Sequence, residues 1–300
     1  MSLPALFLLR HDATAPAEPD GTTRSHVASV EQADPSDPQV SVADLAATRG
    51  DGIFESIGVF GGRAQAVDAH VARLARSAAL LDLPVPDEAA WRDAIDQAVA
   101  AGADDEAFLI KLVLTRGDEG GDRPTAWAHA FVMPDHTAEQ TAGIRAVTLD
   151  RGYRSDVAET SPWLLQGAKT LSYAVNLAAL REARRRGADD VVFVSSDAVV
   201  LEGPNSTVVA RLGSTLVTTP PSLGVLEGTT QASLFEHAIA VGLSTEYRAM
   251  TVDEIRAADA LWLLSSGRLL APVVELDGRA VSTDPEFTAD AVAFLRARHR

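Results

Sequence analysis

The chain has 300 residues, a formal net charge of −16 at pH 7, 46% hydrophobic residues and no cysteine. By length and composition it is expected to fold into one large or two medium globular domains, of which we favour two. The acidity argues against a nucleic-acid partner, which needs a basic footprint. The lack of cysteine excludes disulfides, thiolate metal sites and a cysteine nucleophile.

The apolar runs of the chain are no longer than a strand, so no membrane span is expected. The first run, residues 3–9, resembles the start of a signal peptide. However, it lacks a positively charged beginning, and Arg10, His11 and Asp12 interrupt it before the small residues. We therefore predict that this run is the first strand of a cytoplasmic protein.

The first part of the chain predicts an N-terminal α+β domain over residues 1–135. Residues 12–38 are rich in Pro, Asp, Ser and Ala and lack an apolar period, so we expect an irregular insertion there. Beyond it, the apolar spacing predicts strands at 53–60, 64–67, 108–115 and 127–133, and helices at 68–81 and 91–101.

Small and polar residues at 136–143 predict a linker to a C-terminal domain over residues 144–300. In that domain the pattern predicts strands at 144–149, 191–194, 199–201, 207–210, 216–218 and 260–264, and helices at 173–186, 229–241 and 253–258. The predicted fold class is therefore α+β, a mixed α/β chain of two domains. The glycines within 117–121 are not followed by a helical period, so a dinucleotide-binding fold is not predicted.

Lys169 is the first candidate for chemistry. Gly167 and Ala168 before it leave room for a ring, and Lys111 is the only other lysine in the chain. Arginine cannot replace an amine that must lose its proton, because the guanidinium group stays charged. The plain alternative is a surface lysine near the start of a helix.

A carboxylate and a helix start follow this lysine in the chain. Glu202 comes directly after an apolar run, and Gly228 precedes the helix predicted from Thr229. The free N–H groups of a helix start can hold a phosphate, and a carboxylate can hold the proton on a pyridine nitrogen. A solvated carboxylate and a capping threonine are the plain alternatives. Taken together, the amine, the carboxylate and the helix start predict a pyridoxal 5'-phosphate (PLP) enzyme.

These residues resemble the class IV aminotransferase family, the fold-type IV PLP enzymes. The resemblance implies the two-domain fold of D-amino acid aminotransferases, with PLP between the domains, and a homodimer. It covers about residues 41–285, and its matching segments are 49–55, 70–74, Lys169, 201–203, 226–230 and 265–267.

The resemblance also implies a role for each matching position. Lys169 corresponds to the lysine that binds PLP as a Schiff base, Glu202 to the carboxylate at the pyridine nitrogen, and Tyr173 to a group beside the phenolic oxygen. Helical spacing puts Tyr173 on the same face as Lys169, in agreement with this role. The groups implied around the phosphate are Arg73, Gly228, Thr229, Thr230 and Ser266. The chain departs from the family at Thr207, where asparagine is usual, and at Gln231, where arginine is frequent.

On the substrate side, the strand predicted at 108–115 carries Lys111 in an apolar run. This stretch looks like the pattern of 4-amino-4-deoxychorismate lyases, in which a lysine and an arginine meet two substrate carboxylates. Here the arginine is Arg123. The resemblance therefore implies a lyase that makes 4-aminobenzoate and pyruvate for folate synthesis.

Two alternatives stay open beside the lyase. One is an aminotransferase acting on branched-chain or D-amino acids, although branched-chain enzymes more often carry arginine at the position of Lys111. The other is a PLP-binding protein without turnover, against which the intact Lys169 and Glu202 argue. The seven histidines show no paired metal-ligand spacing, so no metal is expected. The expected partner is a small-molecule carboxylate.

Overall fold

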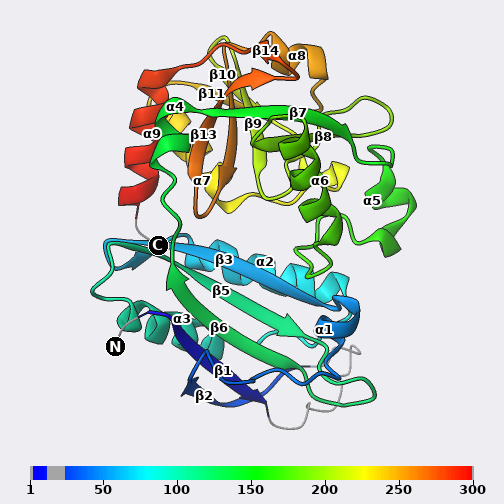
Figure 1. The fold of residues 1–300 in the computed structure, drawn as a ribbon, viewed down its shortest axis with the longest axis vertical. Coiled ribbons are helices and arrows are strands. Elements are labelled where there is room, and N and C mark those ends of the chain that lie inside the picture. The colour runs from blue at the N-terminus through cyan, green and yellow to red at the C-terminus, as the bar shows by residue number, and fades with distance from the viewer. Residues whose placement is uncertain (1–2, 12–23, 299–300) are drawn as a thin grey trace. The chain divides into compact units, whose positions relative to one another are not determined.

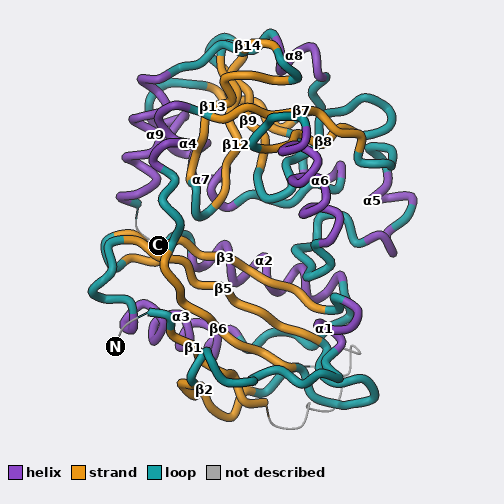
Figure 2. The backbone as a smooth tube through the Cα atoms, viewed as in Figure 1, coloured by secondary structure: helices purple, strands orange, loops and turns teal. Residues whose placement is uncertain are grey.

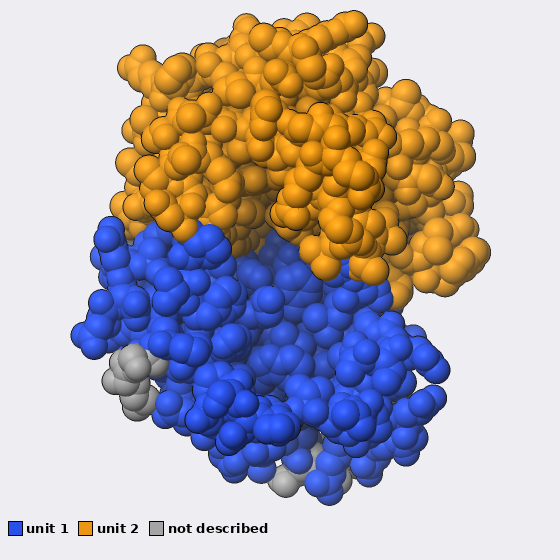
Figure 3. Space-filling view, viewed as in Figure 1, with its two compact units in different colours: residues 1–134, 168–173, 299–300 blue, residues 135–167, 174–298 orange. Residues whose placement is uncertain are grey.

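A computed structural model describes residues 3–11 and 24–298, which form two compact units (Figures 1 and 3). Unit 1 takes in the chain up to Pro134 together with residues 168–173, and unit 2 takes in residues 135–167 and 174–298. The predicted division placed residues 168–173 in the C-terminal half. The structure groups them with unit 1, because they pair with one of its strands. Both units contain helices and strands, which confirms the α+β class.

Unit 1 is built on a six-stranded sheet in the order β2-β1-β6-β5-β3-β4. Helices α2 and α3 pack on one face of this sheet, behind it in the view of Figure 1. The strands are β1 (Ala5–His11), β2 (Val27–Ala33), β3 (Gly52–Phe60), β4 (Arg63–Ala64), β5 (Ala107–Thr115) and β6 (Thr125–Val132). The helices are α1 (Leu45–Arg49), α2 (Val67–Leu80) and α3 (Glu88–Ala101).

The two faces of this sheet differ in burial, as the period of two in a strand requires. On β5, Phe108, Ile110 and Leu112 are fully buried against the helices. Leu109 and Lys111, which point to the other face, are only partly buried. The second face therefore remains partly open to solvent, and Lys111 lies on it.

The irregular insertion expected at 12–38 needs a correction. Residues 12–23 lie outside the described part of the chain, but Val27–Ala33 forms strand β2, which pairs antiparallel with β1. No residue of this edge strand is buried, so it lacks the apolar alternation by which strands are recognised. The strand is held by backbone hydrogen bonds to β1, and these bonds do not depend on which side chains are present.

Unit 2 contains an eight-stranded sheet in the order β11-β10-β9-β12-β13-β7-β8, with β14 paired to β13. Val208, Leu261 and Val273 lie in the larger of its buried apolar clusters, and Ala183 and Val191 lie in the smaller one. The strands are β7 (Ile144–Asp150), β8 (Asp190–Val194), β9 (Thr207–Leu212), β10 (Thr215–Thr218), β11 (Ser244–Tyr247), β12 (Ala260–Ser265), β13 (Leu269–Leu276) and β14 (Arg279–Ala280). The helices are α4 (Thr137–Ala142), α5 (Val157–Thr160), η1 (Pro162–Leu164), α6 (Ala174–Arg185), η2 (Pro221–Leu223), α7 (Thr229–Ala240), α8 (Val252–Arg256) and α9 (Pro285–Ala297).

One predicted strand of unit 2 is wrong. Val199 and Val200 form isolated bridges to Thr251 and Val194, and residues 199–201 do not form a strand. Their backbone is still held, because Leu201 N–H donates to the Phe193 carbonyl and Phe193 N–H donates to the Glu202 carbonyl. In the described part of the chain, no helix combines the length and apolarity that crossing a bilayer requires.

Candidate active site

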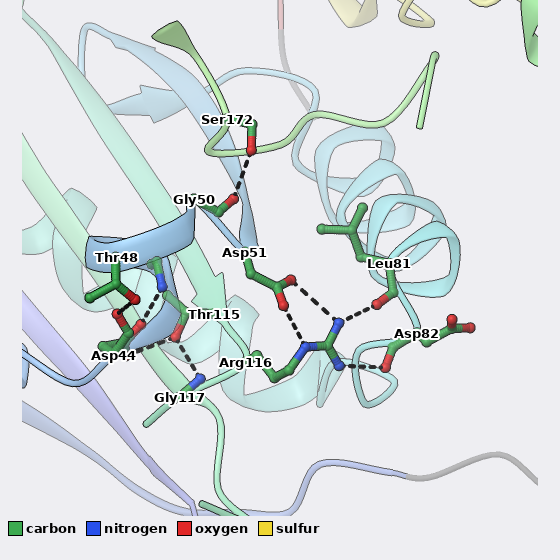
Figure 4. Close-up of polar contacts among 11 residues, drawn as sticks. Asp44, Thr48, Gly50, Asp51, Leu81, Asp82, Thr115, Arg116, Gly117 and Ser172 are labelled. Carbon is green, nitrogen blue, oxygen red and sulfur yellow. Dashed lines mark hydrogen bonds and ion pairs between the residues drawn. The ribbon is translucent and has the colours of Figure 1, made fainter. Parts of the chain in front are cut away.

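The segment that carries Lys169 runs as a loop between η1 and α6 and lies along the start of β3 (Figure 2). Phe54 N–H donates to the Lys169 carbonyl at 3.0 Å, and Leu171 N–H donates to the Gly52 carbonyl at 2.8 Å. The Ser172 hydroxyl extends this pairing by donating to the Gly50 carbonyl at 3.2 Å (Figure 4). The lysine backbone is therefore fixed as if it belonged to one further strand of the sheet.

The start of β3 is itself anchored to the rest of unit 1 (Figure 4). The Arg116 guanidinium holds the Asp51 carboxylate, with Nε to Oδ2 at 2.6 Å. It also donates to the carbonyls of Leu81 and Asp82 at the end of α2, at 2.6 and 3.2 Å. One side chain thus ties the strand that carries the lysine segment to the end of a helix.

The Lys169 side chain lies over the face of an aromatic ring. Its Nζ is 4.4 Å from the centroid of the Phe54 ring, and Tyr173 meets the same ring edge-on with centroids 5.4 Å apart. The Lys169 N–H also donates to Ser77 Oγ on α2 at 3.1 Å. Phe54 therefore contacts both residues, through its backbone and its ring.

Arg73 lies on α2 in a buried charged cluster. Its Nε and Nη2 donate to the two carboxylate oxygens of Glu55 at 2.7 and 2.6 Å, and His70 Nδ1 lies 2.7 Å from the same carboxylate. Glu55 and His70 are fully buried, and Arg73 is 5% exposed. Burial alone would raise the pKa of Glu55, but the charges and hydrogen bonds of Arg73 and then His70 outweigh it and lower that pKa. Glu55 is thus held as a carboxylate that fixes the arginine.

The second lysine lies on the partly open face of the same sheet. Lys111 Nζ is 6.0 Å from the Phe54 ring centroid and 5.8 Å from the Phe131 ring centroid. Both lysines of the chain thus lie within 6.0 Å of the Phe54 ring centroid.

Arg123, in contrast, lies in the loop between β5 and β6. Its side chain is 62% exposed, and Nε is 4.0 Å from the Asp122 carboxylate. The base of this loop is tight because Gly117 has φ +87° and a Cβ there would overlap the Arg123 carbonyl. The loop backbone is therefore pinned, while the arginine side chain extends into solvent.

In unit 2, Glu202 is tied to the segment that leads into α7. Its Oε2 accepts from the Leu226 N–H at 3.0 Å, two residues before the N-cap Gly228. Burial raises the pKa of Tyr153, and the charge of Glu202 adds to that rise against the opposing charge of Arg151. The carboxylate and the helix start are thus fixed relative to each other by a short stretch of chain.

The start of α7 has the features of an anion site. Gly228 is its N-cap, and the described residues supply no side-chain cap for the first turn. Thr229 and Thr230 are 6% and 3% exposed, and Thr230 Oγ1 is buried without a hydrogen-bond partner among the described residues. A Cβ at Gly228 would overlap Oγ1 of Thr207, so the backbone approaches closely there. Ser266 lies in the turn between β12 and β13 of the same unit.

The candidate residues fall into two groups, one in each unit. Unit 1 brings Lys169, Tyr173 and Lys111 around Phe54 and holds Arg73 beside Glu55. Unit 2 holds Glu202 close to the start of α7. No role was predicted from the sequence for Phe54, Glu55 or His129. Phe54 and Glu55 belong to the matching segment 49–55, whereas the only signal for His129 was its position in a predicted strand. The described residues contain no group of three or more His, Cys, Asp or Glu side chains suited to a metal ion.

Comparison with known proteins identifies the family of the chain. Residues 52–276 match the family model for amino-transferase class IV. Because the match covers most of the chain, the protein belongs to the class IV aminotransferase family, as the motifs had indicated. It is thus an enzyme of a family that uses PLP, the cofactor predicted from the sequence.

Three relatives illustrate the similarity. A bifunctional aminodeoxychorismate lyase / D-amino acid transaminase from Mycobacterium tuberculosis is 46% identical over 263 residues, 84% of this chain and 90% of the relative. The structure of a fold IV-transaminase from Curtobacterium pusillum is 49% identical, with a TM-score of 0.91 over 98% of this chain and 99% of that one. A PLP-bound hypothetical aminotransferase from Mycobacterium tuberculosis is 44% identical, with a TM-score of 0.84 over 89% and 96%. These structures confirm the fold type.

Proposed function

We propose that this enzyme is a PLP-dependent 4-amino-4-deoxychorismate lyase, which forms 4-aminobenzoate and pyruvate. The observation that carries the proposal is the meeting of the chain's two lysines on the Phe54 ring, with Nζ of Lys169 at 4.4 Å and Nζ of Lys111 at 6.0 Å from its centroid. One amine is needed for proton transfer, and a second cation beside aromatic rings suits an anionic cyclic substrate. The lyase activity in the name of the relative that is 46% identical supports this reading.

The residues of this chain fit PLP. We assign Lys169 as the lysine that holds the cofactor and Glu202 as the acceptor of the proton on the pyridine nitrogen, with Tyr173 beside the phenolic oxygen. For the phosphate, the uncapped first turn of α7 offers N–H groups, and the buried Thr230 hydroxyl offers a further donor. The other groups assigned to the phosphate are Gly228, Thr229, Ser266 and Arg73.

PLP supplies an aldehyde that combines with amines and a ring that takes up electrons from the carbon bearing the substrate amine. In our account, Nζ of Lys169 removes the proton from that carbon. The bond between the substrate ring and its ether oxygen then breaks, and Lys169 returns the proton to the departing enolpyruvyl group, which becomes pyruvate. The substrate ring becomes aromatic as the bond breaks. The two products together contain all the atoms of the substrate, so no second substrate is needed.

The substrate has two carboxylates, and we assign their recognition to Lys111 and Arg123. Lys111 is the better placed of the two, because it lies on the same face as Phe54 and Phe131. Arg123 is exposed in its loop and has to turn toward the substrate from there. We further propose the homodimer and the cytoplasmic location expected from the sequence, with a domain boundary at 136–143.

A second candidate is an aminotransferase acting on D-amino acids or on branched-chain amino acids. It is favoured by the transaminase activity in the names of two relatives. In that reaction Lys169 would carry the proton from the substrate carbon to a cofactor carbon, so the same residues serve both chemistries. The two differ in whether an amino acceptor is required.

The test is to incubate the PLP-loaded protein with enzymatically generated aminodeoxychorismate and no added keto acid, and to follow 4-aminobenzoate by fluorescence. We expect 4-aminobenzoate and pyruvate in equal amounts, and loss of both in Lys169→Ala. Arg92→Gln is the matched control, because it also removes a cation of unit 1 but one that pairs with Asp68 and Glu88 on the surface and has no role in the proposed reaction. Absence of product, together with conversion of PLP to its amine form by a D-amino or branched-chain amino acid, would assign the enzyme to the transaminases.

A further inference from the structure

His129 lies directly opposite Lys111 in the sheet of unit 1. In the antiparallel pairing of β5 and β6, Lys111 is matched with His129, so both side chains point to the partly open face. The His129 ring also lies beside Phe131, with ring centroids 5.2 Å apart and an angle of 32° between the planes. An imidazole and an ammonium group therefore share one small area between aromatic rings.

Neither group is satisfied by the part of the chain that the structure describes. His129 Nε2 is buried and has no hydrogen-bond partner there. No carboxylate of the described residues forms an ion pair with Lys111, whose Nζ lies near the Phe54 and Phe131 rings. A buried polar atom without a partner is costly in a folded protein, unless a ligand supplies the missing hydrogen bond.

The His129 ring is also partly exposed, although its Nε2 atom is buried. Together with Phe131, the ring lines a hollow of about 890 Å³ on unit 1, whose other walls are residues 3–5, the end of β2 at 32–33 and the turn that follows at 34–36. The one carboxylate in that wall, Asp34, already accepts hydrogen bonds from the N–H and hydroxyl of Ser36. The hollow thus presents an imidazole whose neighbouring acid is engaged elsewhere.

We propose that Lys111 and His129 together form a binding site for a carboxylate of the substrate, in which His129 determines the preference for dicarboxylates over monocarboxylates. This inference rests on the proposed function for the identity of the substrate, but it concerns only the anion site. Lys111 supplies the charge, and the His129 Nε2 atom, which is buried in the ring position of the structure, supplies the directed hydrogen bond when the ring turns toward the ligand. Phe54 and Phe131 flank the site with ring faces that suit a cyclic substrate.

The site has a built-in pH dependence. Burial, and then the charge of Lys111, lower the pKa of His129, so the free protein holds this imidazole neutral. The side chains beside His129 on its own and the neighbouring strand are apolar or aromatic: Leu6 on β1, and Trp127 and Phe131 on β6. The carboxylate of Asp34 already accepts a hydrogen bond from the Ser36 hydroxyl. A bound carboxylate favours the protonated imidazole and raises its pKa. Binding of a dicarboxylate is therefore expected to strengthen as the pH falls.

The test uses two unreactive probes, isophthalate with two ring carboxylates and benzoate with one, and measures their binding to the PLP-loaded protein by calorimetry. For the wild type we expect isophthalate to bind about tenfold more tightly near pH 6 than near pH 8, because the bound carboxylate raises the pKa of His129 and binding then takes up a proton at the lower pH. In His129→Gln this pH dependence should vanish and isophthalate binding near pH 6 should weaken about tenfold, while benzoate changes less than about twofold. His136→Gln, in unit 2, is the matched control.

A second measurement does not depend on a ligand. In histidine-labelled protein, the resonance missing from His129→Gln identifies His129, and its titration midpoint should rise in Lys111→Met and also on addition of isophthalate to the wild type. Equal isophthalate affinity at the two pH values, or an unchanged midpoint in Lys111→Met, would overturn the proposal. Absence of lyase activity with these effects intact would reject the proposed function and leave the anion site standing.

Discussion

Glu55 and Arg73 form a bidentate ion pair inside unit 1, with Nε to Oε1 at 2.7 Å and Nη2 to Oε2 at 2.6 Å. His70 contributes a third contact to the same carboxylate at 2.7 Å. The arginine that we assign to the cofactor phosphate is therefore already oriented by its own protein. An arginine fixed in this way loses little side-chain entropy when it binds an anion.

Glu55→Gln is expected to lower the free energy of unfolding by about 3 kcal/mol, because it leaves Arg73 buried beside a neutral partner. Urea denaturation measures this change. Glu88→Gln is the matched control, since Glu88 pairs with Arg92 on the surface and is 65% exposed, so its loss should have little effect.

The same pair predicts how stability depends on pH. The folded state lowers the pKa of Glu55, so its contribution is complete above the unfolded pKa of about 4.3 and is lost as the pH falls below it. The difference in unfolding free energy between wild type and Glu55→Gln should stay constant from neutral pH to about pH 5 and then shrink in acid. A difference that widens in acid would contradict the assigned charge state.

Thr230→Val separates cofactor binding from folding. The hydroxyl of Thr230 is buried and lacks a partner among the described residues, so its removal should leave the stability of the cofactor-free protein unchanged or slightly higher. PLP affinity should fall about tenfold, because a phosphate donor is lost, whereas Thr230→Ser should keep it. Thermal melts without PLP and absorbance titrations with PLP measure the two effects. Equal PLP affinity in Thr230→Val and wild type would remove Thr230 from the phosphate site.

Gly228→Ala tests the close approach at the start of α7. A Cβ at this position would overlap Thr207 Oγ1 and lie 3.2 Å from the Cβ of Gln231. We expect a loss of about 1–3 kcal/mol in stability together with weaker PLP binding, because the first turn has to shift. Adding Thr207→Ala removes the closest atom and should restore part of both. The equivalent change at Gly213 is not a clean control, since its φ of +62° disfavours alanine in its own right.

The candidate site residues could be proposed from the sequence because they stand in short, ordered motifs. Lys169 and Glu202 follow recognisable runs, and the helix start at Thr229 was placed correctly. The pairing of residues 168–173 with β3 could not be predicted, because it depends on backbone hydrogen bonds between segments far apart in the chain. The ion pair of Glu55 and Arg73 could not be predicted either, because it joins side chains 18 positions apart in the chain. The sequence suggested only a phosphate-binding role for Arg73.

Other parts of the fold were not predicted correctly, for different reasons. Strand β13 runs from Leu269 to Leu276 in the centre of the unit 2 sheet, yet Pro272 interrupts its pattern. Proline is unusual in a central strand, so the sequence pattern does not predict one there. Residues 199–201 gave the opposite error, since an apolar run that looked like a strand is held by isolated bridges.

The most direct test of the account is to identify the lysine that carries PLP. Borohydride makes the bond between PLP and its lysine permanent, and mass spectrometry of the resulting peptides then locates the label. With only Lys111 and Lys169 in the chain, the outcome is unambiguous. We predict that the label is on Lys169 and that Lys169→Arg takes up none. A label on Lys111, or a protein that binds PLP tightly without labelling Lys169, would contradict the central claim.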